Sequence, residues 1–358
     1  MLNPQAARVP SDPVETFARE ALERAKGWAD GLLTARMAAR FGPVTVRVEA
    51  CGNAITTLAL EGLRHAEDKG QGAADFRIIA VDSKETGIDA PPAWSFPATG
   101  ERAHWCRQQF DEGHLEVGLN PVWRTWGILD RRRRLGLVWS ADAAGTPEWV
   151  IRDQTRNILH WWSSGRDWGL FHAAALKLGA VGCLVAGKSG SGKSTLTAAA
   201  IAAGFTTAGD DFVLIDPRET FPIVHSVFHT VKLDEASLGR VPAFHGKAFK
   251  AIDAPREKFL VRLFEVAPGS LVSGFPIHAI LHSRVSGQRE SRVARSTSAG
   301  GFHAIAPSTT FELRSLENEI VARTAALVRA VPTYSFEFGT DVDAALRELR
   351  SFMSGLRP

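Results

Sequence analysis

The first half of the chain contains two kinds of hydrophobic pattern, which together predict a mixture of helices and strands. Apolar residues recur at helical spacing through residues 14–42 and again through 146–165, with good helix formers between them. Short apolar or alternating segments predict strands at 43–50, 75–83, 114–120, 122–130 and 135–142, the last three in an antiparallel sheet. Residues 1–165 are therefore expected to form a smaller N-terminal α+β domain, which we assign to binding a substrate or partner without naming one.

The second half has a different order, in which strands and helices follow one another as they do in α/β proteins. A strand pair is predicted within 170–187, and it is followed by a Gly-rich loop, a helix at 194–203 and a short strand at 205–209. Further elements are predicted as strands at 227–233, 259–267 and 278–285 and as helices at 317–331 and 341–353. We therefore expect a second, α/β domain over residues 166–358.

Composition narrows the class of protein. The 358 residues are 45% hydrophobic and 23% charged, a mixture that favours folded domains over a disordered chain. No run of about 18 apolar residues predicts a membrane span, and the first residues lack the pattern of a signal peptide. A net charge of +3 gives no argument for nucleic acid or a membrane as partner, and three scattered cysteines favour a reducing, cytoplasmic location.

The most informative segment is the Gly-rich loop that precedes the helix at 194–203. It reads Gly-Lys-Ser-Gly-Ser-Gly-Lys-Ser from Gly187 to Ser194, a full match to the Walker A pattern of phosphate-binding loops. Glycines allow the backbone N–H groups of such a loop to turn toward phosphate oxygens, and the helix adds the positive end of its dipole. Lys193 is expected to reach the β- and γ-phosphates, and the Ser194 hydroxyl is expected to hold Mg²⁺. The predicted nucleotide contacts are Gly187, Ser189, Gly190, Ser191, Gly192, Lys193, Ser194 and Thr195.

Two adjacent acids follow soon after the loop. Asp210 and Asp211 come directly after the strand at 205–209, so that one strand–loop–helix–strand unit carries both the loop and the acids. Neighbouring carboxylates repel each other unless a cation lies close to them. One acid of the pair is therefore expected to hold the metal, and the other to take a proton from an acceptor hydroxyl. The alternative is a pair of acids that caps a turn.

Together these features resemble the HPr kinase/phosphorylase family, whose core is shared with phosphoenolpyruvate carboxykinases. That family has a His and a strand pair, followed by the loop G-x-S-G-x-G-K-S, and the His and the loop correspond here to His172 and residues 187–194. A helix that ends in Gly and a strand that ends in A-D-D come next, and their ends correspond to Gly204 and Gly209-Asp210-Asp211. The resemblance implies an ATP- and Mg²⁺-dependent kinase domain of this type over 166–358, with His172 and Lys193 as active-site residues and Ser194 as a metal ligand. It also implies that Asp211 is the proton acceptor, so that Asp210 is expected to help hold Mg²⁺. Because the family is often oligomeric, it also implies that the chain could form a homo-oligomer.

The sequence departs from the family's pattern downstream of the acids. The E-x-R-G signature, which supplies a metal-binding Glu, is absent, and Glu235 lies near its expected place. The later Arg-bearing loop is also missing, and the candidates to replace it are Lys232, Arg256 and Lys258. The resemblance is therefore to a wider group of kinase-like relatives, some of which phosphorylate a Ser of a ribosomally made peptide such as a lasso-peptide precursor.

Three classes of function remain open at this point. The first is a kinase that acts on a Ser or Thr hydroxyl of a peptide or protein. The second is a kinase of a small hydroxyl compound, such as a free amino acid or a sugar. The third is a nucleotide-gated binding protein with little turnover. A peptide kinase requires an exposed groove for its substrate, whereas a small-molecule kinase requires a closed pocket.

A run of arginines in the first half is the strongest local concentration of charge. Arg131 to Arg134 follow Asp130 between two predicted strands, so they are expected at the tip of a hairpin. They form either a solvated turn or a basic patch that receives an acidic peptide or a phosphate.

Overall fold

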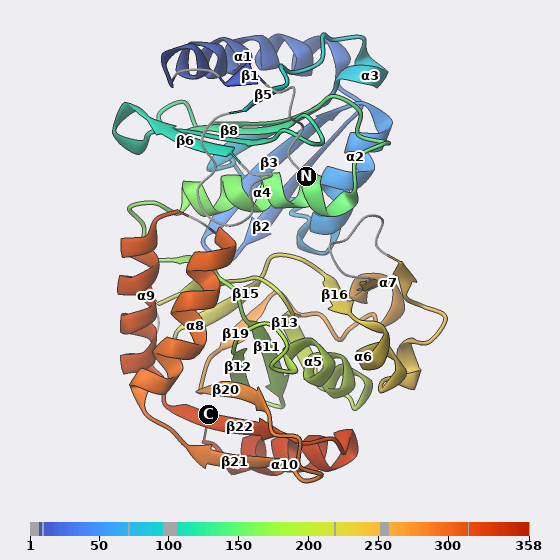
Figure 1. Cartoon of the computed structure of the whole chain (residues 1–358), viewed down its shortest axis with the longest axis vertical. Coiled ribbons are helices and arrows are strands. Elements are labelled where there is room, and N and C mark those ends of the chain that lie inside the picture. Colours follow the sequence, from blue (N-terminus) through green and yellow to red (C-terminus); the bar gives the residue numbers. More distant parts are fainter. Residues whose placement is uncertain are drawn as a thin grey trace. The chain divides into compact units, whose positions relative to one another are not determined.

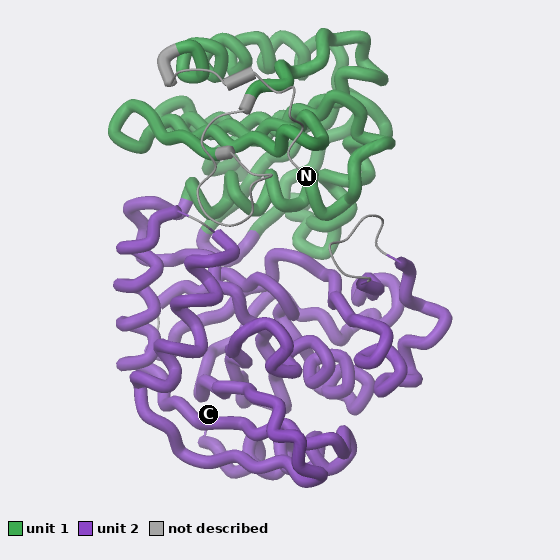
Figure 2. The backbone as a smooth tube through the Cα atoms, in the orientation of Figure 1, with its two compact units in different colours: residues 1–40, 44–162 green, residues 41–43, 163–358 purple. Residues whose placement is uncertain are grey.

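The chain divides into two compact units, which Figure 2 shows in different colours. The computed structural model describes residues 7–8, 11–70, 72–95, 106–217, 220–250, 258–313 and 315–357. Unit 1 comprises residues 1–40 and 44–162, and unit 2 comprises 41–43 and 163–358. The chain passes from one unit to the other between Trp162 and Ser163, whereas the sequence pattern placed the boundary after residue 165.

Unit 1 is built around one mixed sheet. The neighbouring strands are, in order, β2 (Ala35–Phe41), β3 (Val44–Cys51), β4 (Phe76–Asp82), β9 (Leu135–Ser140), β8 (Thr125–Asp130), β7 (Leu115–Asn120) and β6 (Cys106–Phe110). Strands β3, β4 and β9 are parallel, and β9, β8, β7 and β6 are antiparallel, as expected for the last three predicted strands. A separate pair joins β1 (Ala7–Arg8) to β5 (Trp94–Ser95).

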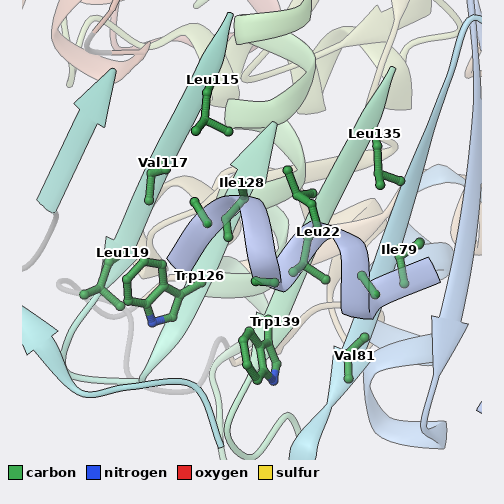
Figure 3. Close-up of a cluster of buried hydrophobic side chains, with 14 of the residues drawn as sticks. Leu22, Ile79, Val81, Leu115, Val117, Leu119, Trp126, Ile128, Leu135 and Trp139 are labelled. Carbon is green, nitrogen blue, oxygen red and sulfur yellow. The ribbon is translucent and has the colours of Figure 1, made fainter. Parts of the chain in front are cut away.

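Helices cover both faces of this sheet. On one face, α1 (Ser11–Leu32) contributes Leu22 to a buried cluster that also contains Val117, Ile128 and Trp139 of the sheet (Figure 3). Because side chains alternate along a strand, the neighbouring Gly118 faces the other side, where Trp161 of α4 (Glu148–Trp162) packs on it. The remaining helical segments of unit 1 are α2 (Asn53–Leu60), η1 (Glu61–Ala66), α3 (Ser83–Thr86) and η2 (Asp111–Gly113).

The long helix predicted over residues 14–42 is wrong in its second half. Helix α1 ends at Leu32, and residues 35–41 form strand β2, in which Met37, Ala39 and Phe41 are buried at every second position. The Ala- and Arg-rich composition of this segment suits a helix, but pairing with β3 and burial of one side override that preference.

The charge of the arginine run is partly neutralised within unit 1. Arg131, Arg132 and Arg133 lie in the turn between β8 and β9, as predicted, and each forms an ion pair with a carboxylate of unit 1. The partners are Glu116, Asp111 and Glu23, at N–O distances of 4.0, 2.8 and 2.6 Å. These neighbouring carboxylates offset the charge of the turn, which favours the interpretation as a structural hairpin.

The described residues of unit 2 form three sheets. The largest has the order β13 (Thr206–Gly209), β11 (Ala174–Leu178), β12 (Val181–Ala186), β20 (Ala279–Val285), β22 (Thr333–Phe338) and β21 (Arg292–Arg295), with β12, β20 and β22 parallel. An antiparallel sheet joins β10 (Gly169–Phe171), β14 (Val213–Asp216), β15 (Ile223–Ser226) and β19 (Gly274–Pro276). A small sheet joins β16 (Thr230–Leu233), β18 (Phe259–Arg262) and β17 (Phe249–Lys250).

Helices also cover both faces of the six-stranded sheet of unit 2 (Figure 1). Cys183 and Val185 of β12 pack with α5 (Lys193–Ala202) and α10 (Val342–Gly355). The alternate residues, Leu184 and Ala186, pack with α8 (Ser298–Leu313) and α9 (Glu317–Ala330). The short helical segments are α6 (Glu235–Gly239), η3 (Pro242–Phe244) and α7 (Leu263–Val266), so the strand predicted at 259–267 ends at Arg262 and continues as a helix.

The prediction of a mixed α/β fold is confirmed at this level of detail. The helix predicted at 194–203 corresponds to α5, which begins and ends one residue earlier. Across the described ranges, no helix is both long enough and apolar enough to cross a membrane.

Candidate active site

The Gly-rich loop connects the end of β12 to the start of α5. Gly187 has a φ of +153° and Gly192 a φ of +87°, and L side chains rarely adopt either conformation. A methyl group on Gly187 would lie 2.6 Å from the Ser283 carbonyl oxygen of β20, and one on Gly192 would lie 2.6 Å from Cδ1 of Phe338 in β22. Both positions therefore require glycine, for conformation and for space. Strands β20 and β22 thus set the shape of the loop.

Lys193 lies across this loop. Its side chain is buried, and its Nζ donates hydrogen bonds to the carbonyl oxygens of Gly187, at 2.7 Å, and Lys188, at 3.2 Å. Burial lowers the pKa of Lys193, while the negative charges of Asp210 and Asp211 act in the opposite direction. The ammonium group is therefore held between the loop carbonyls and the acid pair, where an anion bound by the loop would meet it.

Asp210 is the most unusual group of the site. It follows β13 at Gly209 and is only 2% exposed, and within the described residues neither of its carboxylate oxygens has a hydrogen-bond partner. Burial raises the pKa of Asp210 to about 6, while the nearby Ser194 hydroxyl, Lys193 ammonium and Lys232 backbone N–H act to lower it. A buried carboxylate without a partner is energetically unfavourable unless a cation joins it.

The donor set around Asp210 fits Mg²⁺. This ion prefers oxygen ligands and takes one or two carboxylates, with water and substrate phosphates completing the shell. Asp210 and Ser194 would supply a carboxylate and a hydroxyl beside the loop. Among the described residues, no group of three or more His, Cys, Asp or Glu side chains could hold a metal ion without such additional ligands.

Asp211 is held by two neighbours instead. His172 Nε2 lies 3.2 Å from its Oδ1, and Lys232 Nζ lies 2.5 Å from its Oδ2. Burial alone would raise the pKa of Asp211, but the Lys232 ammonium and the His172 imidazole outweigh this effect and hold it well below its ordinary value. The carboxylate is therefore ionised and fixed in orientation at neutral pH.

Three separate elements supply this arrangement. Asp211 follows β13, Lys232 comes from β16, and His172 follows β10 with its backbone N–H donating to Thr309 Oγ1 of α8 at 3.1 Å. The same helix carries Glu312, whose charge acts on Lys193 and raises its pKa. The sequence reasoning did not assign Thr309 or Glu312 to the site, because no helix was predicted there.

The remaining predicted nucleotide contacts differ in their burial and in their hydrogen-bond partners. Thr195 is buried and its hydroxyl lies 2.7 Å from that of Ser237 in α6, so it connects two helices. The Ser191 hydroxyl is buried without a partner among the described residues, Gly190 has open space around it, and Ser189 is exposed.

The candidate replacements for the missing family signatures do not all approach the loop. Glu235 is exposed in the first turn of α6. Lys232 contacts Asp211, as described, and Lys258 is close enough to Lys193 to lower its pKa. Arg256 lies outside the described residues.

No protein-family model and no curated protein matches the chain. Among solved structures, the chain has a weak similarity to the Hpr(Ser) kinase/phosphatase from Coxiella burnetii. The TM-score is 0.30 and the sequence identity 13%, over 52% of this chain and 93% of the other. A TM-score of this size supports no inference about fold or activity, so the site is interpreted from its own residues.

Proposed function

We propose that unit 2 is a kinase domain that binds ATP with Mg²⁺ and transfers the γ-phosphoryl group to a Ser or Thr hydroxyl of a peptide or protein. The observation that carries this proposal is the buried, unpartnered Asp210 carboxylate beside a glycine loop and the buried Lys193. A loop of this kind binds phosphates, and an unpaired acid beside it binds the metal that accompanies them. The activity belongs in the cytoplasm, where ATP and Mg²⁺ are available.

Each residue has a distinct part in the proposed reaction. The N–H groups of the loop and the start of α5 bind the phosphates, and Lys193 neutralises charge on the β- and γ-phosphates. Asp210 and Ser194 would hold Mg²⁺, which supplies charge neutralisation during transfer. The bond between the γ-phosphorus and the bridging oxygen breaks as the acceptor oxygen bonds to phosphorus, and ADP leaves.

Asp211 is proposed to accept the proton of the acceptor hydroxyl. Its low proton affinity suits a late transfer, because phosphoryl transfer passes through a loose transition state in which the hydroxyl needs little activation. Lys232 and His172 keep the carboxylate ionised and fixed in orientation. The main contribution of Asp211 is therefore to position the hydroxyl, and the proton moves as the new bond completes.

The partial exposure of Asp211 and its partner Lys232 favours an acceptor carried by a larger molecule. The side chains of Asp211 and Lys232 are 26% and 29% exposed, so a side chain that projects from a peptide can reach them from solvent. A kinase of a small hydroxyl compound would instead enclose its acceptor.

Phosphoryl transfer to a peptide library tests the proposal. The purified chain is incubated with Mg-ATP and a library of peptides that contain Ser or Thr, and phosphorylated peptides are identified by mass spectrometry. We expect phosphopeptides with the wild-type protein and none with Lys193→Ala. Lys177→Ala, which changes a lysine of β11 outside the loop, serves as the matched control and should retain transfer. Equal transfer by Lys193→Ala and the wild type would refute the assignment.

A further inference from the structure

We propose that Val285 and the turn after it, residues 285–289, form the surface on which the nucleoside part of the bound nucleotide lies. This inference rests on the proposed function, because it requires phosphates in the glycine loop. It concerns a surface that none of the predicted contacts includes. Four observations support it: the position of the acids, the course of β20, the exposure of Val285 and the anchoring of the turn.

The acids define which end of the loop receives the γ-phosphate. Asp210 and Asp211 follow β13, which lies beyond β11 on one side of β12. The γ-phosphate must lie near these acids and Lys193 for transfer to occur. The α-phosphate and the nucleoside therefore leave the loop toward its other flank, where β20 is the neighbour of β12.

Strand β20 extends past the end of β12 and lies against the loop. Ala186, the last residue of β12, is opposite His282, and the next residue, Ser283, donates from its Oγ to the Ser191 carbonyl oxygen at 2.8 Å. Two residues further on, Val285 lies beside Gly192, since a methyl group on Gly192 would be 3.5 Å from Val285 Cγ2. Val285 is therefore adjacent to the start of α5, on the flank away from the acids.

Val285 is an exposed apolar side chain at this position. Its exposed fraction is 52%, although the residues opposite it and two positions before it, Phe338 and Ser283, are buried. A single exposed valine is unremarkable elsewhere on a protein surface. Beside a phosphate loop it offers an apolar contact to the face of a base.

The turn that follows Val285 is held in place by backbone hydrogen bonds. The N–H of Ser286 donates to the Phe338 carbonyl at 3.0 Å, and the N–H of Thr340 donates to the Gln288 carbonyl at 2.8 Å. The N–H of Asp341 donates to the Arg289 carbonyl at 3.2 Å. A surface held in this way is already formed before a ligand arrives, which reduces the entropy lost on binding.

Comparison of two ligands separates the nucleoside surface from the phosphate loop. Calorimetric titration measures the affinity of the wild type, Val285→Asn and Val321→Asn for Mg-ATP and for magnesium tripolyphosphate, which lacks a nucleoside. Asparagine is neutral, so it does not repel phosphates, and Val321 of α9 is a control of similar exposure, at 45%. We expect Val285→Asn to weaken ATP binding by about five- to tenfold and to change tripolyphosphate affinity by less than about twofold.

The possible results distinguish the two proposals. If the wild type binds neither ligand, the proposed function is refuted together with this inference. If both ligands bind the wild type and Val285→Asn leaves ATP affinity unchanged or weakens both ligands equally, this inference alone is refuted. Photo-crosslinking of the wild type with 8-azido-ATP provides a second test, which does not depend on a variant. The label is expected on residues 284–289, and a label confined to another segment would overturn the proposed surface.

Discussion

Replacement of Gly187 by alanine tests whether the loop has the shape described. At a φ of +153°, an alanine is in a region of backbone conformation that is almost restricted to glycine. Its methyl group would also lie 2.6 Å from the Ser283 carbonyl oxygen and 2.7 Å from Ser191 Oγ. The Ser283 carbonyl cannot easily retreat, because β22 pairs with β20 at this residue and the Ser283 hydroxyl donates a hydrogen bond to the Ser191 carbonyl.

The expected loss of stability is the sum of the cost of the backbone conformation and the cost of the close contacts. A residue forced into a glycine conformation costs about 1–3 kcal/mol, and overpacking at a buried position costs about 1–3 kcal/mol more. If the loop keeps its shape, the loss is one of stability, and the melting temperature falls by about 5–15 °C. If the loop moves to relieve the contact, its N–H groups no longer converge, and each 1.4 kcal/mol lost in binding weakens Mg-ATP affinity by about tenfold.

Gly179→Ala is the matched control for this experiment. Gly179 lies in the turn between β11 and β12 with a φ of +58°, and a methyl group there would meet no atom within 4 Å. It therefore carries only the cost of the left-handed conformation, about 1–2 kcal/mol. Thermal unfolding and Mg-ATP titration are measured on both variants. If Gly187→Ala does not differ from Gly179→Ala in either quantity, the described loop geometry is incorrect.

Three further predictions concern the acids. Asp211→Asn preserves shape and removes the proton acceptor, so the rate of phosphoryl transfer to a substrate peptide identified from the library should fall by about 10²–10⁴-fold, with ATP affinity little changed. Loss of ATP binding as its main defect would contradict the role assigned. Asp210→Asn removes the carboxylate that would hold the metal, so it should abolish the dependence of ATP affinity on Mg²⁺; an unchanged Mg²⁺ dependence would exclude a metal at Asp210. Lys232→Met leaves Asp211 with one partner fewer, so it should lower the free energy of unfolding by about 1–3 kcal/mol. Additivity with Asp211→Asn in a double-variant cycle would show that the pair is not coupled.

The loop and the helix after it could be predicted from sequence because their signals are local. Gly192 and Gly204 mark the two ends of the helix, and the pattern of Gly187 to Ser194 depends on eight consecutive residues. The acid pair was found for the same reason, since Asp210 and Asp211 follow a short strand directly. None of these inferences required knowledge of distant contacts.

The rest of the site depends on contacts between distant segments, which one sequence does not reveal. Lys232 approaches Asp211 only because β16 returns to the acids 21 residues later. Helix α8 was not predicted, because Gly300, Gly301 and an internal Pro307 argue against a helix, and yet it brings Thr309 to His172. Its burial against β20 and α9 overrides these local preferences, as pairing with β3 does for β2.

The most direct test of the central claim is an equilibrium titration of the whole chain with ATP, with and without Mg²⁺. The site described here predicts one ATP bound per chain, with an affinity that rises on addition of Mg²⁺. It also predicts that Lys193→Ala weakens this binding by at least about 100-fold, because a buried, charge-assisted contact to phosphate is lost, whereas Lys177→Ala has no effect. Absence of binding by the wild type, or equal binding by Lys193→Ala, would contradict the assignment of this loop as a nucleotide site.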